Sequence, residues 1–276
     1  NWNSGTAQGG IVQAPNGNWY SIVFQDHGAL GRIPVLVPVK FVDDFPVFGA
    51  AGFTPREVTV PDLRPDYQYK PLYSNDFTNP AWQWNHIPNK ALVKLEADTF
   101  TVKTDKICKN VVQAANTLTQ RTFTEHCAGS VEVDVSKLNN GDIAGLCALE
   151  GEYGFIGITK KDDKYKLIIA EHKIPYSPWS MGVFDDEEPV ITTEKDLSSP
   201  KLKLKATFNL EHTKEQVQFA FSENLDEKEA FEDFGDPVKL RYTLDQFVGV
   251  RFALFCYSTE KAGGSASFKE FKLDLL

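Results

Sequence analysis

The first fifty residues carry three short strand patterns in succession, and this arrangement limits what the chain can fold into. Gln8-Gly9-Gly10-Ile11-Val12 reads as a strand, Pro15-Asn16-Gly17-Asn18 as a turn, and Trp19-Tyr20 as the start of a second strand. The polar loop Phe24-Gln25-Asp26-His27 leads to a third strand that begins near Gly31-Arg32-Ile33-Pro34. The pattern predicts one blade-sized antiparallel sheet. Because a single blade cannot bury both of its faces, the sheet either belongs to a larger fold or packs on another polypeptide.

Short strand patterns continue along the rest of the chain, and helical periodicity is nearly absent. Apolar residues alternate with polar ones, as is typical of strands, at Val131, Val133 and Val135, at Leu202, Leu204, Ala206 and Phe208, and at Val217, Phe219 and Phe221. Turn residues separate the patterns, for example at Asn139-Asn140-Gly141-Asp142. The succession predicts an antiparallel sandwich. Leu225–Phe234 is the one stretch that predicts a short helix.

A proline-rich stretch divides the chain. Pro55, Pro61, Pro65 and Pro71 fall among charged residues, with little apolar periodicity. Such a segment is expected to be an extended linker on the surface. We therefore predict a partial sheet over residues 1–52, a linker over 53–71 and a sandwich of jelly-roll type over 72–276.

Composition narrows the choice of partners. The net charge is −9, which argues against nucleic-acid binding. No run of 18 apolar residues occurs, so we expect no membrane span. The chain starts at Asn1, its single Met is Met181, and it has no signal-peptide pattern, so we expect a processed, trimmed or partial chain. An extracellular, a periplasmic and a cytoplasmic location all stay open.

The four cysteines do not follow a metal-binding spacing. They are Cys108, Cys127, Cys147 and Cys256, and the last three lie in apolar strand patterns. We expect free buried thiols, with a disulfide as the alternative.

Arg32 and His27 are the candidate functional side chains of the first fifty residues. Arg32 follows a glycine, and its guanidinium could bind sugar hydroxyls or a carboxylate. The alternative is a surface arginine paired with Asp26 or Asp44. His27 could act as a general acid or base, although a lone histidine in a loop is usually just solvated.

A tryptophan pair is the candidate of the second part. Trp82 and Trp84 are two residues apart, so both indoles face one side of a strand. Exposed, they could stack on sugar rings, with Asn85 and His86 binding hydroxyls. Packed against the sheet, they would instead be core residues with locally bonded indole N–H groups. The acidic pairs Asp185-Asp186 and Glu187-Glu188 are expected to form a solvated loop.

Taken in order, these motifs resemble glycoside hydrolase family 43, the β-xylosidase and α-L-arabinofuranosidase group. The resemblance rests on Gln8-Gly9-Gly10-Ile11-Val12, Gly17-Asn18-Trp19-Tyr20, Gly31-Arg32, Phe45-Pro46-Val47, Trp82-Gln83-Trp84-Asn85-His86, Asn116-Thr117-Leu118-Thr119-Gln120-Arg121-Thr122 and Phe247-Val248-Gly249-Val250-Arg251. It implies an all-β chain in which the last blade of a five-bladed β-propeller precedes an antiparallel, concanavalin-like β-sandwich.

The resemblance also implies a function. Members hydrolyse xylosyl or arabinofuranosyl linkages with inversion, using paired carboxylates that come from earlier blades, so it places no catalytic residue in this chain. It implies that Arg32 contacts the sugar of the innermost subsite and that Phe247 closes one wall of the pocket, with core packing as the alternative for Phe247. With Gln8, His27, Trp82 and Trp84, these two residues are our candidate substrate-binding set.

The expected partners are an oligo- or polysaccharide and the missing propeller blades. No cofactor is required. A structural calcium ion is an option, with Asp76 and Asp274 as candidate ligands near the first and last strands of the sandwich. Two alternatives stay open, namely a stand-alone carbohydrate-binding sandwich without catalysis and a structural or adhesive sandwich.

Overall fold

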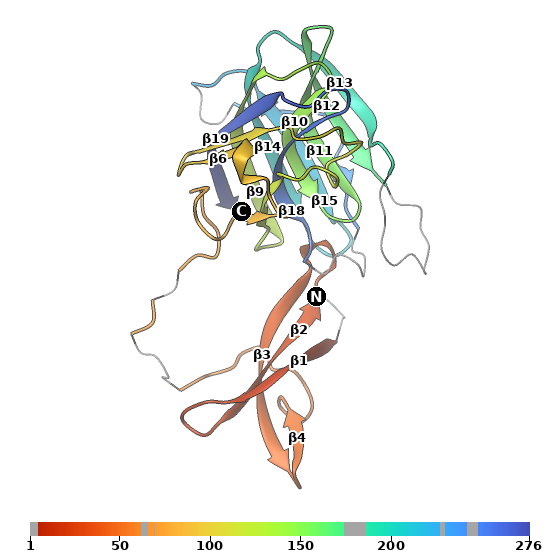
Figure 1. Cartoon of the computed structure of the whole chain (residues 1–276). Coiled ribbons are helices and arrows are strands. Elements are labelled where there is room, and N and C mark those ends of the chain that lie inside the picture. Colours follow the sequence, from red (N-terminus) through yellow and green to blue (C-terminus); the bar gives the residue numbers. More distant parts are fainter. Residues whose placement is uncertain (1–4, 62–65, 69, 174–185, 227–229, 242–247) are drawn as a thin grey trace.

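The computed structural model describes residues 5–61, 66–68, 70–173, 186–226, 230–241 and 248–276. Within these ranges the helical elements are two single 3-10 turns, η1 (Gly28–Leu30) and η2 (Lys90–Leu92), and all other regular elements are strands. None of the helices in these ranges is long or apolar enough to cross a membrane. Figure 1 shows a sandwich of two sheets and a smaller sheet that extends from one end of it.

The smaller sheet has four strands in the order β1-β2-β3-β4 and is called the blade sheet below. Its strands are β1 (Thr6–Gln13), β2 (Trp19–Asp26), β3 (Arg32–Val42) and β4 (Phe45–Phe48). Strands adjacent in sequence pair antiparallel to one another, as the turn residues predict. The result is a meander of blade type.

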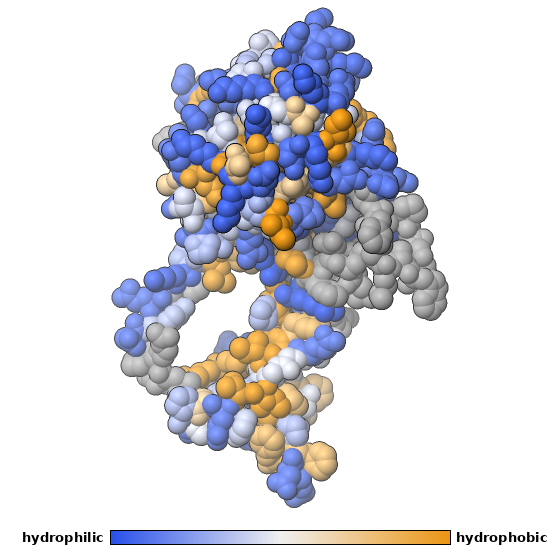
Figure 2. All heavy atoms as spheres, in the orientation of Figure 1, coloured by the Kyte–Doolittle hydropathy of each residue, from blue (hydrophilic) through white to orange (hydrophobic). Residues whose placement is uncertain are grey.

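Both faces of the blade sheet expose apolar side chains. Directly paired residues of antiparallel strands point to the same face, and the register assigns Ile11, Phe41 and Phe48 to one face. Their exposed fractions are 41%, 47% and 38%. The opposite face exposes Val12, Ile22, Leu36, Val42, Phe45 and Val47. Figure 2 shows the apolar surface that gathers over this sheet, whereas a sheet packed on one side only would present polar groups on the other.

The sandwich consists of a seven-stranded and an eight-stranded sheet. The seven-stranded sheet has the order β13 (Val190–Leu197), β12 (Lys164–His172), β11 (Tyr153–Lys161), β10 (Asp142–Leu149), β18 (Arg251–Ser258), β8 (Leu118–Arg121), β5 (Gln83–Trp84). The eight-stranded sheet has the order β16 (Glu232–Asp233), β15 (Gln216–Ser222), β14 (Lys201–Asn209), β9 (His126–Lys137), β19 (Ser265–Leu275), β7 (Thr99–Lys103), β6 (Val93–Leu95), with β17 (Val238–Lys239) paired to β15. All named strand pairs are antiparallel, as predicted.

The main core lies between these two sheets. Val131, Val133 and Val135 of β9 are at most 1% exposed, which confirms their alternation as an inward-facing row. The apolar residues of the predicted rows in β14 and β15 are likewise buried. Phe100 and Phe268 stack with their ring centroids 5.7 Å apart. Burial of each large apolar side chain stabilises the fold by about 1.5–3 kcal/mol.

A second apolar layer covers the outer face of the seven-stranded sheet. Cys108, Val111 and Ala114 come from the loop that precedes β8 and join side chains of the sheet, including Cys147 and Phe255. All four cysteines are free and buried, as predicted. Burial raises the pKa of the Cys127 thiol to about 12, so this thiol stays protonated at neutral pH.

The short helix predicted over Leu225–Phe234 is wrong. The described part of this stretch contains β16 and no helix, while residues 227–229 lie outside the described ranges. Glu232 pairs with Phe221, and Phe234 is buried with its ring centroid 5.5 Å from that of Phe221. Tertiary pairing with β15 thus overrides the weak local preference of the segment.

Candidate functional site

The blade sheet joins the sandwich at the turn between β2 and β3. The turn η1 buries Ala29 and Leu30, which are 0% and 5% exposed and belong to the sandwich core. The Ala29 N–H donates to Glu215 Oε1 at 2.8 Å, and the Ala29 carbonyl accepts from the Val250 N–H at 2.8 Å. The blade sheet is therefore anchored at two places, just before β15 and just before β18.

Two glycines make this contact close. Gly31 has φ +90° and Gly249 has φ +76°. A Cβ on Gly31 would lie 2.6 Å from the Val248 carbonyl oxygen, and one on Gly249 would lie 2.3 Å from the Leu30 carbonyl oxygen. Both positions therefore require glycine for conformation and for space. The Gly31-Arg32 motif and the Val248-Gly249 motif, far apart in sequence, meet here backbone to backbone.

Arg32 begins β3 next to this junction. Its Nε donates to Asp26 Oδ1 at 2.9 Å, which confirms one of the pairings given as the alternative for this residue. Its guanidinium carbon lies 4.0 Å from the centre of the Phe24 ring. An ion pair and a cation–π contact together hold the planar guanidinium in one orientation. Arg32 is thus held in a fixed orientation at the start of β3.

Gln8 and His27 lie at the same end of the blade sheet as Arg32. His27 Nε2 is 3.0 Å from Gln25 Oε1, and Gln25 pairs with Thr6 of β1. Burial lowers the pKa of His27, while Glu125 and Asp26 act in the opposite direction. Gln8 is exposed and forms a bulge in β1 with φ 42°. The structure therefore gathers these candidates at the end of the blade sheet that faces the junction.

Phe247 lies outside the described residues, so its role as a pocket wall stays a prediction. Val248, the next residue along the chain, is 44% exposed, and its carbonyl lies against Gly31. Asp185 also lies outside the described residues.

The tryptophan platform is not available at Trp82. Trp82 is 6% exposed, its indole N–H donates to the Ser74 carbonyl at 3.0 Å, and its ring contacts Phe77 and Phe271. Trp84 packs against the same core and meets Phe100 edge-on, at 5.9 Å between ring centroids. Both indoles face the same side, as their spacing predicts, and that side is the core. Trp82 is therefore a core residue, the alternative given for it above, because a ring packed in the core has no free face for a sugar.

The calcium site predicted at Asp76 and Asp274 stays a prediction. The Asp76 carboxylate accepts hydrogen bonds from the Thr78 N–H at 2.7 Å and the Thr78 hydroxyl at 2.6 Å. These bonds lower the pKa of Asp76. Within the described ranges, no group of three or more His, Cys, Asp or Glu side chains could hold a metal ion. The ends of the sandwich do meet as predicted, since Asn75 Oδ1 accepts from the Leu273 N–H at 3.1 Å.

An acidic cluster beside the junction was missed from the sequence. Glu150 is 2% exposed, and neither of its carboxyl oxygens has a hydrogen-bond partner among the described residues. Burial, with the nearby Glu215 and Glu152, raises the pKa of Glu150 well above its ordinary value. Glu152 forms an ion pair with Arg241 at 2.7 Å. Sequence patterns give no signal for Glu150, because it directly follows an apolar strand and reads as a turn residue.

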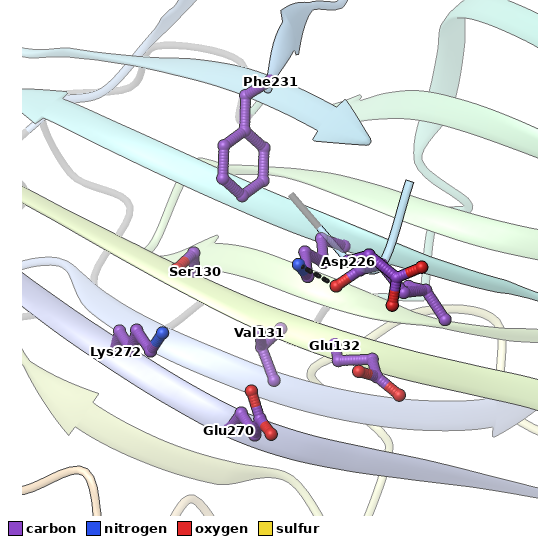
Figure 3. A pocket seen from close by; sticks show the side chains of 9 residues that line it. Ser130, Val131, Glu132, Asp226, Phe231, Glu270 and Lys272 are labelled. Atoms are coloured by element: carbon purple, nitrogen blue, oxygen red, sulfur yellow. Dashed lines mark hydrogen bonds between the residues drawn. The ribbon is translucent and has the colours of Figure 1, made fainter. Parts of the chain in front are cut away.

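A hollow of about 130 Å³ lies on the eight-stranded sheet, and none of the predicted site residues lines it. Figure 3 shows its lining, with Ser130, Val131, Glu132, Asp226, Phe231, Glu270 and Lys272 labelled. Lys203, also in the lining, donates to the Leu225 carbonyl. The hollow is small and its charges are of both signs, so it does not select a class of ligand.

Comparison with known proteins identifies the family. Residues 72–274 match the family described as the β-xylosidase C-terminal concanavalin A-like domain. This chain belongs to that family. A bifunctional GH43-CE protein of Bacteroides eggerthii superposes with a TM-score of 0.79 and 33% identity, over 99% of this chain and 34% of that one. A GH43 glycoside hydrolase engineered for endo-xylanase and exo-arabinofuranosidase activity superposes with a TM-score of 0.83 and 22% identity, over 99% and 55% of the two chains.

The blade sheet is included in these superpositions, since they cover 99% of this chain. The fold class is therefore confirmed as a partial propeller blade followed by a concanavalin-like sandwich. A protein of Xylanibacter ruminicola that carries the provisional name β-xylosidase is 32% identical over 97 residues, which are 31% of this chain and 18% of that protein. This member of the C-terminal domain family thus spans only about a fifth to a half of the proteins it resembles.

Proposed function

We propose that this chain is the C-terminal portion of a family 43 glycoside hydrolase that acts on xylan- or arabinan-derived sugars. In the complete enzyme, xylosyl or arabinofuranosyl linkages are hydrolysed with inversion by carboxylates on other blades. The observation that carries the proposal is a blade sheet with apolar side chains exposed on both faces, joined to a sandwich of this family.

The two exposed faces are the surfaces for the remaining propeller blades. Every blade of a closed propeller, including the last, packs between two neighbours, so it must be apolar on both faces. Phe45 is 74% exposed and Ile22 56% exposed on one face, and Phe41 is 47% exposed on the other. Neighbouring blades would remove these side chains from water, which contributes about 25 cal/mol for each Å² buried.

The role of this chain is to supply and fix one wall of the sugar pocket. Asp26 and Phe24 orient Arg32, and the bonds of Ala29 to Glu215 and Val250 anchor the turn that precedes it. An oriented guanidinium suits sugar hydroxyls because it offers several N–H donors in one plane. The sandwich therefore acts as a rigid support for Arg32.

A stand-alone carbohydrate-binding sandwich is less well supported. That reading needs the exposed platform of Trp82 and Trp84, and Trp82 lies in the core. It also does not explain why the blade sheet exposes apolar side chains on both faces.

The proposal is tested by turnover of aryl xylosides and aryl arabinofuranosides. We expect none from the 276-residue chain alone, and turnover when the chain is joined to the propeller region. Within that larger protein, Arg32→Gln should lower kcat/KM on the order of 10- to 100-fold, as expected for loss of hydrogen bonds from a charged donor.

Arg56→Gln is the matched control, because Arg56 is an exposed arginine outside the strands of the blade sheet. If kcat/KM is unchanged in Arg32→Gln, Arg32 does not contact the substrate. Turnover by the chain alone, abolished when one of its own carboxylates is substituted, would overturn the proposal.

A further inference from the structure

Two arginines stand side by side on the outer face of the seven-stranded sheet. Arg121 ends β8, Arg251 begins β18, and the antiparallel register places them directly opposite each other. Opposite residues of such a pair point to the same face, with Cβ atoms about 4.5–5.5 Å apart. Ala253, two positions along β18, belongs to the outer apolar layer, which identifies the face. Arg121 and Arg251 are called the arginine pair below.

The arginine pair has no carboxylate partner within the described ranges. Arg251 donates from Nη2 to Asn85 Oδ1 at 2.8 Å and from Nη1 to Thr119 Oγ1 at 3.4 Å, and both acceptors are neutral. The Arg251 Nε is buried and has no acceptor among the described residues. Burial lowers the pKa of both guanidinium groups, and no carboxylate of the described residues opposes this shift.

Such a pair is unusual in an acidic chain. Half-buried charges in proteins are normally paired, because desolvation is unfavourable unless an opposite charge offsets it. This chain has 38 acidic and 29 basic residues, so acids are plentiful. Leu149 of β10 pairs with Arg251 of β18, and the buried Glu150 is the next residue after Leu149. The Glu150 carboxyl group nevertheless makes no hydrogen bond to either arginine. The described part of the sheet therefore presents two positive charges that its own residues leave uncompensated.

The surroundings of the arginine pair fit a sugar acid. Guanidinium groups bind carboxylates through two parallel hydrogen bonds. Asn85 and Thr119 already touch Arg251, and the exposed Gln83 pairs with Thr119, so amide and hydroxyl groups that suit sugar hydroxyls lie alongside. The pair is also close to the junction, since Gly249 contacts Leu30 and Gly31 two residues before Arg251.

We propose that the arginine pair binds the carboxylate of a uronic acid unit carried by the oligosaccharide substrate. The identity of the oligosaccharide rests on the proposed function, whereas the anion site rests on the arginine pair itself. Three motifs that are separate in sequence meet in this site, through Asn85, Arg121 and Arg251. The site would favour acidic, uronyl-substituted xylan fragments over neutral ones.

The test is a calorimetric titration of the 276-residue chain with two matched ligands. One is a xylo-oligosaccharide that carries a single glucuronic acid unit, and the other is the same compound with its carboxyl group reduced to an alcohol. The acidic ligand should bind at least about tenfold more tightly, as expected for charge-assisted hydrogen bonds. Arg121→Gln should abolish that preference.

Arg121→Gln should not lower the melting temperature, because its removal breaks no ion pair among the described residues and relieves repulsion from Arg251. Arg56→Gln, an exposed change of the same charge in the linker, should keep the full preference. Equal binding of the two ligands, or equal loss of the preference in both variants, would overturn the proposal. So would the finding that Arg121→Gln prevents docking of the propeller region while the preference persists, since the pair would then hold a carboxylate of the protein. These titrations need no turnover, so failure of the proposed hydrolysis would leave their outcome unchanged.

Discussion

The sandwich and the blade sheet follow the same alternation of side chains but use it differently. In β9 the inward row Val131, Val133 and Val135 is at most 1% exposed, so one face of the sheet holds the core. In the blade sheet, Ile11 on one face is 41% exposed and Ile22 on the other is 56% exposed. The sandwich buries its inward apolar side chains against other strands of the same chain. The blade sheet leaves its apolar surface for neighbours, so apolar content alone does not show whether a sheet is complete.

The largest contrast is expected between two phenylalanines. Phe268→Ala, at a site that is 0% exposed, should lower the free energy of unfolding by about 3–5 kcal/mol through the cavity it leaves. Phe45→Ala, at a site that is 74% exposed, should change it by no more than about 0.5 kcal/mol. Urea denaturation of both variants measures the difference. Similar losses would show that the blade sheet already buries Phe45 in solution.

The junction should be the next most sensitive place. Gly249→Ala puts a Cβ 2.3 Å from the Leu30 carbonyl oxygen at a positive φ, and should destabilise the junction by more than about 1 kcal/mol. Gly10→Ala is the control, because a Cβ added there would meet nothing within 4 Å. Hydrogen exchange at the Ala29 and Val250 amides should accelerate in the first variant only. Equal exchange in both would disprove the close contact.

A smaller effect is expected from the acceptor of the Ala29 amide. Glu215→Ala removes the 2.8 Å bond and should cost about 1 kcal/mol. Glu215→Gln keeps a side-chain oxygen as acceptor and should retain most of the stability. The Ala29 amide exchange rate distinguishes the two variants. If both exchange at the wild-type rate, Glu215 does not hold the turn.

The smallest change in the free energy of unfolding is expected from Glu150→Gln at acidic pH. This change should grow as the pH rises. Burial raises its folded-state pKa well above the ordinary value of 4.5, so the folded state keeps a proton that the unfolded state releases. Wild-type stability should therefore fall as pH rises from about 4.5 through the folded-state pKa. Glu150→Gln, which has no charge to bury, should gain stability relative to wild type over the same range. A gain that is constant with pH would show that Glu150 does not titrate in this way.

Much of this fold follows from local pattern. Period-two rows such as Leu202, Leu204, Ala206 and Phe208 predict strands and core together, because the pleat sends every second side chain inward. The helix prediction for Leu225–Phe234 fails because Glu232 and Asp233 pair with β15, which local preference does not reveal.

The candidate site was predictable only in part. The sequence identifies the Gly31-Arg32 motif and the Gly249 motif singly, and the structure shows that Gly31 and Gly249 meet backbone to backbone, which no spacing reveals. The spacing of Trp82 and Trp84 correctly places both on one face but cannot say which face is buried. Glu150 and the arginine pair carry no local signal, because their significance lies in how the fold surrounds them.

Native-state hydrogen exchange of this chain is the most direct test of its two-part character. We predict that amides paired between β2 and β3, such as those around Ile22 and Leu36, exchange through openings of much lower free energy than amides of β9 and β14. Adding the propeller region should slow exchange in the blade sheet and leave the sandwich unchanged. Equal protection of both regions in the chain alone would mean that the blade sheet is already a complete core, and would contradict the account.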